Sequence, residues 1–110
     1  MSQIYKREES WYTENNTRYV FLDGTVCADL SACYRSLQEQ LSLPDYFGHN
    51  LDALEEVLED LEWINETCIK IILLNPTGLL AAEVHKKAAF LAVLNNSSND
   101  KLQVYYTGIA

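Results

Sequence analysis

Acidic residues gather along one predicted helix, and their types and spacing suggest a chemical role more clearly than those of the other side chains. Residues 51–61 carry an apolar stripe at helical spacing, and opposite it stand five acids with no base among them: Asp52, Glu55, Glu56, Glu59 and Asp60. Like charges four residues apart repel each other by roughly 0.2–0.5 kcal/mol a pair, so a helix built only for solubility usually alternates its signs. This row of acids, the acidic stripe, is either a solvated face of an acidic protein or a docking surface for a basic cleft.

Catalysis and metal binding are weaker interpretations of the same acids. Paired carboxylates act as general acid and base only in a shielded pocket that separates their pKa values, and the sequence predicts no such shield. Consecutive acids on one helix also lack the histidines and loop carbonyls of the usual metal sites. We therefore expect no catalytic residue, no metal and no cofactor, and a protein that is not an enzyme.

The cysteines and histidines add no second site. Cys27, Cys33 and Cys68 are odd in number and contain no CxxC pair, so reduced, buried thiols are expected. Cys33 falls on an apolar stripe, where core packing outweighs nucleophilic chemistry. His49 and His85 are interpreted as exposed residues.

The loop before the acidic helix carries two aromatic residues. Tyr46 and Phe47 precede Gly48, and they could fold onto the core or act as rigid anchors in an interface. Asn50 is a suitable N-cap for the helix, and Asp52 lies in the first turn, where an acid favours the helix dipole. The helix is therefore predicted to begin directly after this loop.

The charge distribution points to the kind of partner. The net charge of −8 lies entirely within residues 27–75, which hold ten acids and two bases. Such a field repels nucleic-acid phosphates and anionic lipid surfaces, and it attracts basic proteins. A basic protein partner is expected, with no direct binding of nucleic acid or membrane and a monomeric state when the chain is free.

The pattern of elements predicts an α/β domain. Strands are expected at 18–22, 68–74 and 102–106, and helices at 30–41, 51–61 and 79–94. This order makes a small parallel sheet of about three strands, packed by helices, the economical arrangement. The nearly continuous apolar run at 68–74 suggests a central strand covered on both faces.

The chain is expected to be one domain with a distinct beginning. Residues 18–110 form the predicted domain, and residues 1–17 are either an N-terminal arm or an extra edge strand. Neither a secretory signal nor a membrane-spanning segment is evident, so a cytoplasmic location is expected.

Residues 43–54, LPDYFGHNLDAL, resemble the signature of the barstar family, the intracellular protein inhibitors of barnase-type ribonucleases. The match extends in order over about residues 18–107. The resemblance implies a layered α/β domain whose second helix and preceding loop plug a ribonuclease active site. The residues that match the family's inhibitory surface are Tyr46, Gly48, Asn50, Leu51 and Asp52.

At other positions this chain has a different residue type from the family that it resembles. Glu56 stands where the family has its key aspartate, so the charge is kept on a longer side chain. Glu55 and Leu61 stand where the barnase inhibitor has tryptophans, although Trp63 is close by, and Asn96 matches an interface glutamate. The predicted partner-binding set is Tyr46, Phe47, Gly48, Asn50, Leu51, Asp52, Glu55, Glu56 and Glu59.

Two functions therefore follow as expectations. The first is an inhibitor or immunity protein that masks the basic active site of a ribonuclease or related toxin. The second is a binding module of the same fold that serves another basic protein without inhibiting a ribonuclease.

Overall fold

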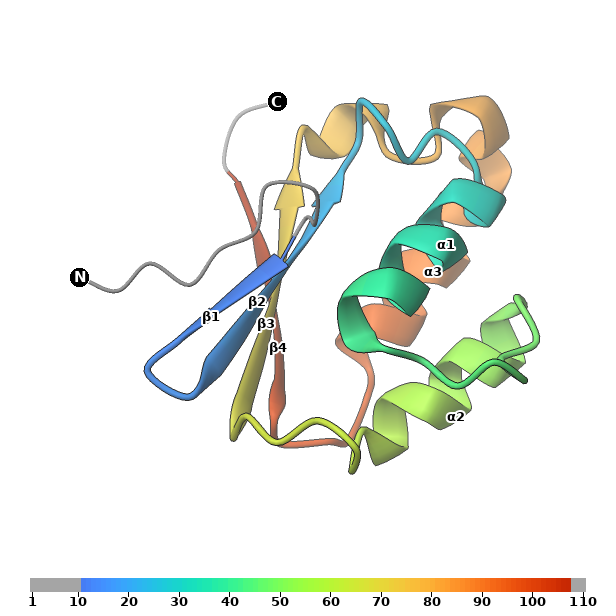
Figure 1. The fold of residues 1–110 in the computed structure, drawn as a ribbon. Helices are drawn as coiled ribbons and strands as arrows, with labels where there is room; N and C mark the ends of the chain where they lie inside the picture. Colours follow the sequence, from blue (N-terminus) through green and yellow to red (C-terminus); the bar gives the residue numbers. More distant parts are fainter. Residues whose placement is uncertain (1–10, 108–110) are drawn as a thin grey trace.

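The computed structural model describes residues 11–107 of the chain, which form a sheet with helices packed on it (Figure 1). The strands are β1 (Trp11–Glu14), β2 (Thr17–Asp23), β3 (Cys68–Leu74) and β4 (Leu102–Tyr106). The α-helices are α1 (Leu30–Leu41), α2 (Leu51–Asp60) and α3 (Lys87–Asn95), and two short 3₁₀ helices are η1 (Pro76–Gly78) and η2 (Ala81–Lys86). The predicted α/β class is confirmed.

The order of the strands places every helix on one side of the sheet. The strands lie in the order β1-β2-β3-β4; β1 pairs antiparallel with β2, and the other two pairings are parallel. Because the parallel strands advance in one direction, right-handed crossovers all fall on the same face. Figure 1 shows α1, α2 and α3 together on that face. The sheet is thus mostly parallel, with β1 as an antiparallel edge strand.

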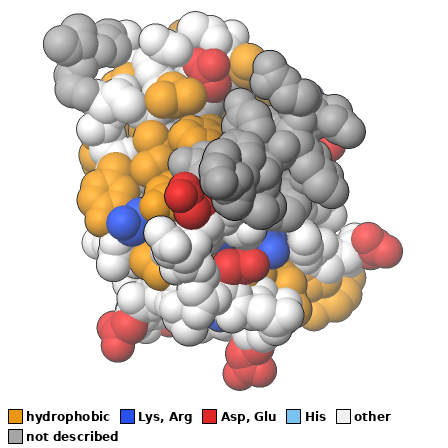
Figure 2. Space-filling view, turned by 60° about the vertical axis from the view of Figure 1, so that its left-hand side comes forward, with side chains coloured by type: hydrophobic (Ala, Val, Ile, Leu, Met, Phe, Trp, Pro, Cys, Tyr) orange, Lys and Arg blue, Asp and Glu red, His pale blue; other side chains and the backbone are white. Residues whose placement is uncertain are grey.

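The expectation that both faces of β3 are covered is not met within residues 11–107. Ile69, Ile71 and Leu73 are fully buried against the helices, whereas the alternate residues of β3 are only half-buried. On the other face the Lys70 Nζ lies 5.9 Å from the ring centroid of Tyr19 and 5.5 Å from that of Tyr105. Figure 2 shows hydrophobic side chains gathered on this side of the molecule. The apolar run reflects a β-branched strand at the centre of the sheet rather than two layers of helices.

Polar caps fix where α1 and α2 begin. Asp29 is the N-cap of α1, and its carboxylate accepts a hydrogen bond from the Ala32 N–H at 2.9 Å. Asn50 caps α2 as predicted, and its side-chain oxygen accepts from the Ala53 N–H at 2.8 Å. Each cap satisfies a backbone donor that the helix itself leaves unpaired.

The helix predicted over 79–94 is wrong in its first half. Only Lys87–Asn95 is α-helical, and the preceding residues form the 3₁₀ helix η2. Leu80 is fully buried with a φ of 57°, and Glu83 has φ −140° and ψ 57°, so the backbone turns twice before the regular helix begins. Burial of Leu80 overrides the helical spacing that the apolar residues suggested.

The core is made by apolar side chains from the sheet and the helices. Leu54 and Leu58 of α2 are fully buried, which fixes the rotation of this helix about its axis. Cys27 and Cys33 are buried free thiols as expected, whereas Cys68 is only half-buried. No helix within the described part of the chain is long and apolar enough to cross a membrane.

Candidate partner-binding surface

The acidic residues of α2 lie on its solvent face. Because Leu54 and Leu58 anchor the opposite side, the acids point away from the core, and all five are exposed: Asp52, Glu55, Glu56, Glu59 and Asp60. Asp52 also lies in the first turn, near the positive end of the helix dipole. The structure thus presents the whole predicted acidic stripe on one surface.

The two loop aromatics take opposite orientations. Tyr46 is 85% exposed, whereas Phe47 is 6% exposed and belongs to the core. The Phe47 ring meets the Tyr34 ring edge-on, with centroids 5.8 Å apart, and it also lies 5.1 Å from the His49 ring. Phe47 therefore supports the loop from beneath, and Tyr46 is the aromatic side chain of this loop that solvent reaches.

Hydrogen bonds hold the rest of the loop in place. The Asn50 side-chain amide donates to the Gly48 carbonyl at 3.0 Å, and His49 Nε2 lies 2.8 Å from Gln38 Oε1 of α1. A Cβ on Gly48 would lie 3.1 Å from the Asn50 amide nitrogen, so glycine permits this close packing. His49 itself has a φ of 46°, which turns the chain sharply into the cap. The loop is thereby tied to both helices.

Residues after α3 hold the far end of α2. The Asn99 side-chain amide donates to the carbonyls of Leu58, Glu59 and Asp60 at 3.1–3.3 Å. Lys101 Nζ donates to the Leu61 and Ile64 carbonyls at 3.0 and 2.7 Å. A donor and a cation at the negative end of the helix dipole offset the acids crowded there.

Glu59 is exposed, but its carboxylate also makes hydrogen bonds within the protein. Its carboxylate accepts hydrogen bonds from the Ser98 hydroxyl and from the Ser98 N–H, the latter at 2.9 Å. These hydrogen bonds, the hydroxyl's first, hold the pKa of Glu59 below its usual range. Glu59 therefore joins α2 to the loop after α3, which distinguishes it from the other acids of the stripe.

The residues that differ in type from the family that the chain resembles lie on α2, just after it and at the end of α3. Leu61 is fully buried and ends α2 with a φ of 49°. The indole N–H of Trp63 donates to the Leu41 carbonyl at 2.8 Å, so this ring is anchored toward α1. Asn96 is exposed at the end of α3, and Glu55 is exposed on α2.

Sequence reasoning missed a groove beside this surface. It lies between α1, η2 and the beginning of α2, and its residues include the buried Tyr34. Three segments far apart in sequence form it, so no local pattern marks it. Within residues 11–107 no group of three His, Cys, Asp or Glu side chains could hold a metal ion.

The comparisons with known proteins agree with this geometry. No curated protein matches the chain. Residues 17–106 match the family described as Barstar (barnase inhibitor), and this match spans the three parallel strands and all three α-helices. With a mostly parallel sheet, helices on one face and an exposed loop leading into an acidic second helix, the chain belongs to the barstar family.

Proposed function

We propose that this protein inhibits a ribonuclease of the barnase type, or a related basic toxin, by covering its active site with α2 and the loop before it. The observation that carries this proposal is the exposed, uninterrupted acidic face of α2, beside the exposed Tyr46, in a chain of the barstar family. The partner-binding set is that expected from the sequence, with Phe47 acting from beneath the loop. The acids Asp52 and Glu56 are its centre.

The chemistry of inhibition follows from what a ribonuclease must bind. A site that holds an RNA phosphate presents arginine, lysine or histidine side chains, and these can equally donate charge-assisted hydrogen bonds to a carboxylate. Because α2 is anchored by Leu54 and Leu58 and capped at both ends, its carboxylates are presented with little loss of backbone freedom on binding. The chain acts as a blocking ligand and performs no reaction.

A second candidate is a basic partner outside the ribonucleases. Glu55 replaces an aromatic side chain with a charge in the middle of the acidic face, and buried Leu61 cannot serve as an anchor in place of tryptophan. These changes favour a more strongly electrostatic interface than an aromatic one. This candidate predicts binding that is sensitive to salt without inhibition of RNA cleavage.

The test is a calorimetric titration of the chain with catalytically disabled barnase-type ribonuclease, together with an RNA cleavage assay on the active enzyme. We expect tight binding that weakens with salt and an enzyme that loses activity at equimolar inhibitor. The double variant Asp52→Lys and Glu56→Lys should abolish both while its unfolding transition stays cooperative.

A matched control separates contact from net charge. The variant Glu14→Lys and Glu39→Lys changes two exposed acids outside α2, on β1 and α1, and alters the total charge equally. It should bind nearly as the unmodified chain does. Equal loss of affinity in both double variants would refute the assignment of the site to α2.

A further inference from the structure

One side chain of α1 contacts both ends of the loop before α2. Gln38 Nε2 donates to the Pro44 carbonyl at 3.3 Å, and Gln38 Oε1 lies 2.8 Å from His49 Nε2. Pro44 and His49 lie on either side of the exposed Tyr46 in the sequence. A single amide therefore joins the beginning of the loop to its end, and we name this pair of hydrogen bonds the Gln38 clamp.

The direction of both hydrogen bonds follows from the chemistry of the groups. A carbonyl can only accept, so the Gln38 amide nitrogen faces Pro44 and the amide oxygen faces His49. His49 Nε2 consequently carries a proton and donates it to that oxygen. The clamp thus needs a donor and an acceptor on one side chain, and an apolar side chain of the same length cannot form it.

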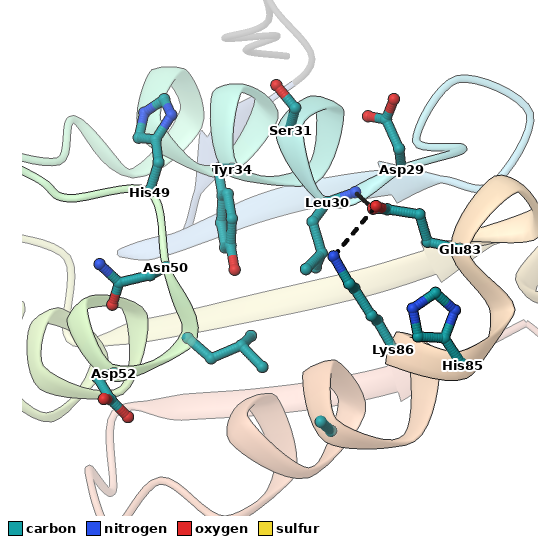
Figure 3. A pocket seen from close by; sticks show the side chains of 12 residues that line it. Asp29, Leu30, Ser31, Tyr34, His49, Asn50, Asp52, Glu83, His85 and Lys86 are labelled. Carbon is teal, nitrogen blue, oxygen red and sulfur yellow. Dashed lines mark hydrogen bonds and ion pairs between the residues drawn. The ribbon is translucent and has the colours of Figure 1, made fainter.

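His49 has a backbone conformation that needs support from its neighbours. Its φ of 46° lies in the left-handed region, which is unfavourable for a residue with a Cβ and persists only where the surroundings hold it. Its ring centroid lies 5.7 Å from that of Tyr34 and 5.1 Å from that of Phe47. Figure 3 shows His49 beside Tyr34, with Asn50 leading from it into α2. These ring contacts and Gln38 together hold the turn from which α2 begins.

The other end of the clamp is joined to Tyr46 through a tight turn. The Pro44 carbonyl also accepts from the Phe47 N–H at 2.9 Å, which closes a turn that contains Tyr46. The backbone carbonyl of Gln38 accepts from the Leu43 N–H at 3.0 Å. The side chain and the backbone of one residue therefore both fix the path by which the chain reaches Tyr46.

We propose that Gln38 is a positioning residue for partner binding, which acts through Pro44 and His49 by holding the loop in the conformation that places Tyr46 beside the acidic stripe. This inference rests on the proposed function, because the partner is the basic protein taken to cover α2. A loop that already has its bound conformation loses little freedom on binding. Without the clamp only a fraction of the molecules has that conformation, and association slows by that fraction.

The first test needs no ribonuclease. Gln38→Met keeps the length of the side chain and removes both hydrogen bonds of the clamp, and Gln103→Met changes an exposed glutamine on the other face of the sheet as a control. Backbone amide exchange is followed by NMR. Because modest hydrogen bonds are lost, we expect the Phe47 amide to exchange about three- to tenfold faster in Gln38→Met and unchanged in the control. An unchanged Phe47 exchange rate in Gln38→Met would overturn the proposal.

The second test separates a positioning role from a contact with the partner. Stopped-flow rates with catalytically disabled barnase-type ribonuclease are measured well below the unfolding midpoint of each variant, so a small change of stability does not affect them. Gln38→Met should lower the association rate about three- to tenfold and leave the dissociation rate unchanged. Tyr46→Ala, which removes a contact, should instead raise the dissociation rate. A change confined to the dissociation rate in Gln38→Met would contradict the positioning role.

A double-mutant cycle tests whether Gln38 acts through His49. His49→Asn removes the ring, and asparagine tolerates the left-handed conformation of this position. In the His49→Asn background, Gln38→Met should slow association less than it does in the unmodified chain, because one hydrogen bond of the clamp is already absent. Equal slowing in both backgrounds would show that His49 has no part in the effect and would overturn the proposal.

The positioning role and the proposed function fail in different ways. If Gln38→Met leaves the Phe47 exchange rate and the association rate unchanged while Asp52→Lys with Glu56→Lys abolishes ribonuclease binding, the clamp has no role and the inhibitor function stands. If the unmodified chain binds no ribonuclease but Gln38→Met speeds exchange at Phe47, the clamp on the loop is confirmed and the ribonuclease assignment is refuted.

Discussion

Tyr46 and Phe47 are adjacent in sequence, but one serves the surface and the other the core. Tyr46 is almost fully exposed, whereas Phe47 packs under the loop against Tyr34 and His49. A pair of alanine substitutions therefore separates binding from folding within two consecutive residues. Phe47 takes the core role that the sequence left open for both residues, and the interface role of Tyr46 stays a prediction.

Tyr46→Ala should change the free energy of unfolding by less than about 0.5 kcal/mol, because little is buried. It should nevertheless weaken binding to the ribonuclease, where a rigid aromatic side chain contributes contact area. Phe47→Ala should cost roughly 3–5 kcal/mol of stability through the lost burial and the cavity left behind. Urea denaturation and calorimetric titration of both variants test this pair, and a stable Phe47→Ala chain would contradict the core role of that ring.

At the scale of elements, α2 is a short helix that depends on neighbours at both of its ends. Ten residues are too few for a stable isolated helix, so tertiary contacts must supply the difference. Asn50 caps its beginning, and Asn99 with Lys101 satisfies carbonyls at its end. The loop after α3, distant in sequence, thereby fixes the direction in which the acidic face points.

Asn99→Ala should loosen the last turn of α2 because three carbonyls lose a donor. A destabilisation of about 1–2 kcal/mol is expected, with faster amide exchange at the end of α2. Ribonuclease affinity should fall only modestly, since Asp52 lies at the other end of the helix. Asn65→Ala, at an exposed asparagine, is the control. Unchanged exchange rates in α2 would show that the cap contributes little.

At the scale of the whole molecule, charge opposes stability and favours association. The net charge of −8 is concentrated between residues 27 and 75, which include both α1 and α2. Like charges repel within the folded chain, and the same charges would steer the basic partner of the proposed function toward α2. Salt screens both effects, because the screening length is only about 10 Å at 0.1 M ionic strength.

Raising the salt concentration should therefore have opposite consequences for the two processes. The unfolding midpoint should rise as repulsion among the acids is screened, and the association rate with a basic ribonuclease should fall. Thermal unfolding and stopped-flow association, each measured across a salt series, test this prediction. An association rate independent of salt would argue that the acids play no part in the encounter.

The sequence determined the parts of this protein that depend on local chemistry. The strand at 68–74 and the helices at 30–41 and 51–60 lie where periodicity and caps placed them, since β-branched runs and polar caps act within a few residues. The acidic stripe was readable because Leu54 and Leu58 mark the buried face of α2. Barstar-family membership was likewise indicated by one stretch, residues 43–54.

Only the tertiary structure decided what depends on contacts between distant segments. The first half of the helix predicted over 79–94 is not α-helical, because the burial of Leu80 outweighs local spacing. Phe47 lies in the core, because its ring packs against those of Tyr34 and His49. The partner of Glu59 is Ser98, thirty-nine residues away. The groove around Tyr34 exists because three segments meet, and packing between such segments leaves no periodic trace in the chain.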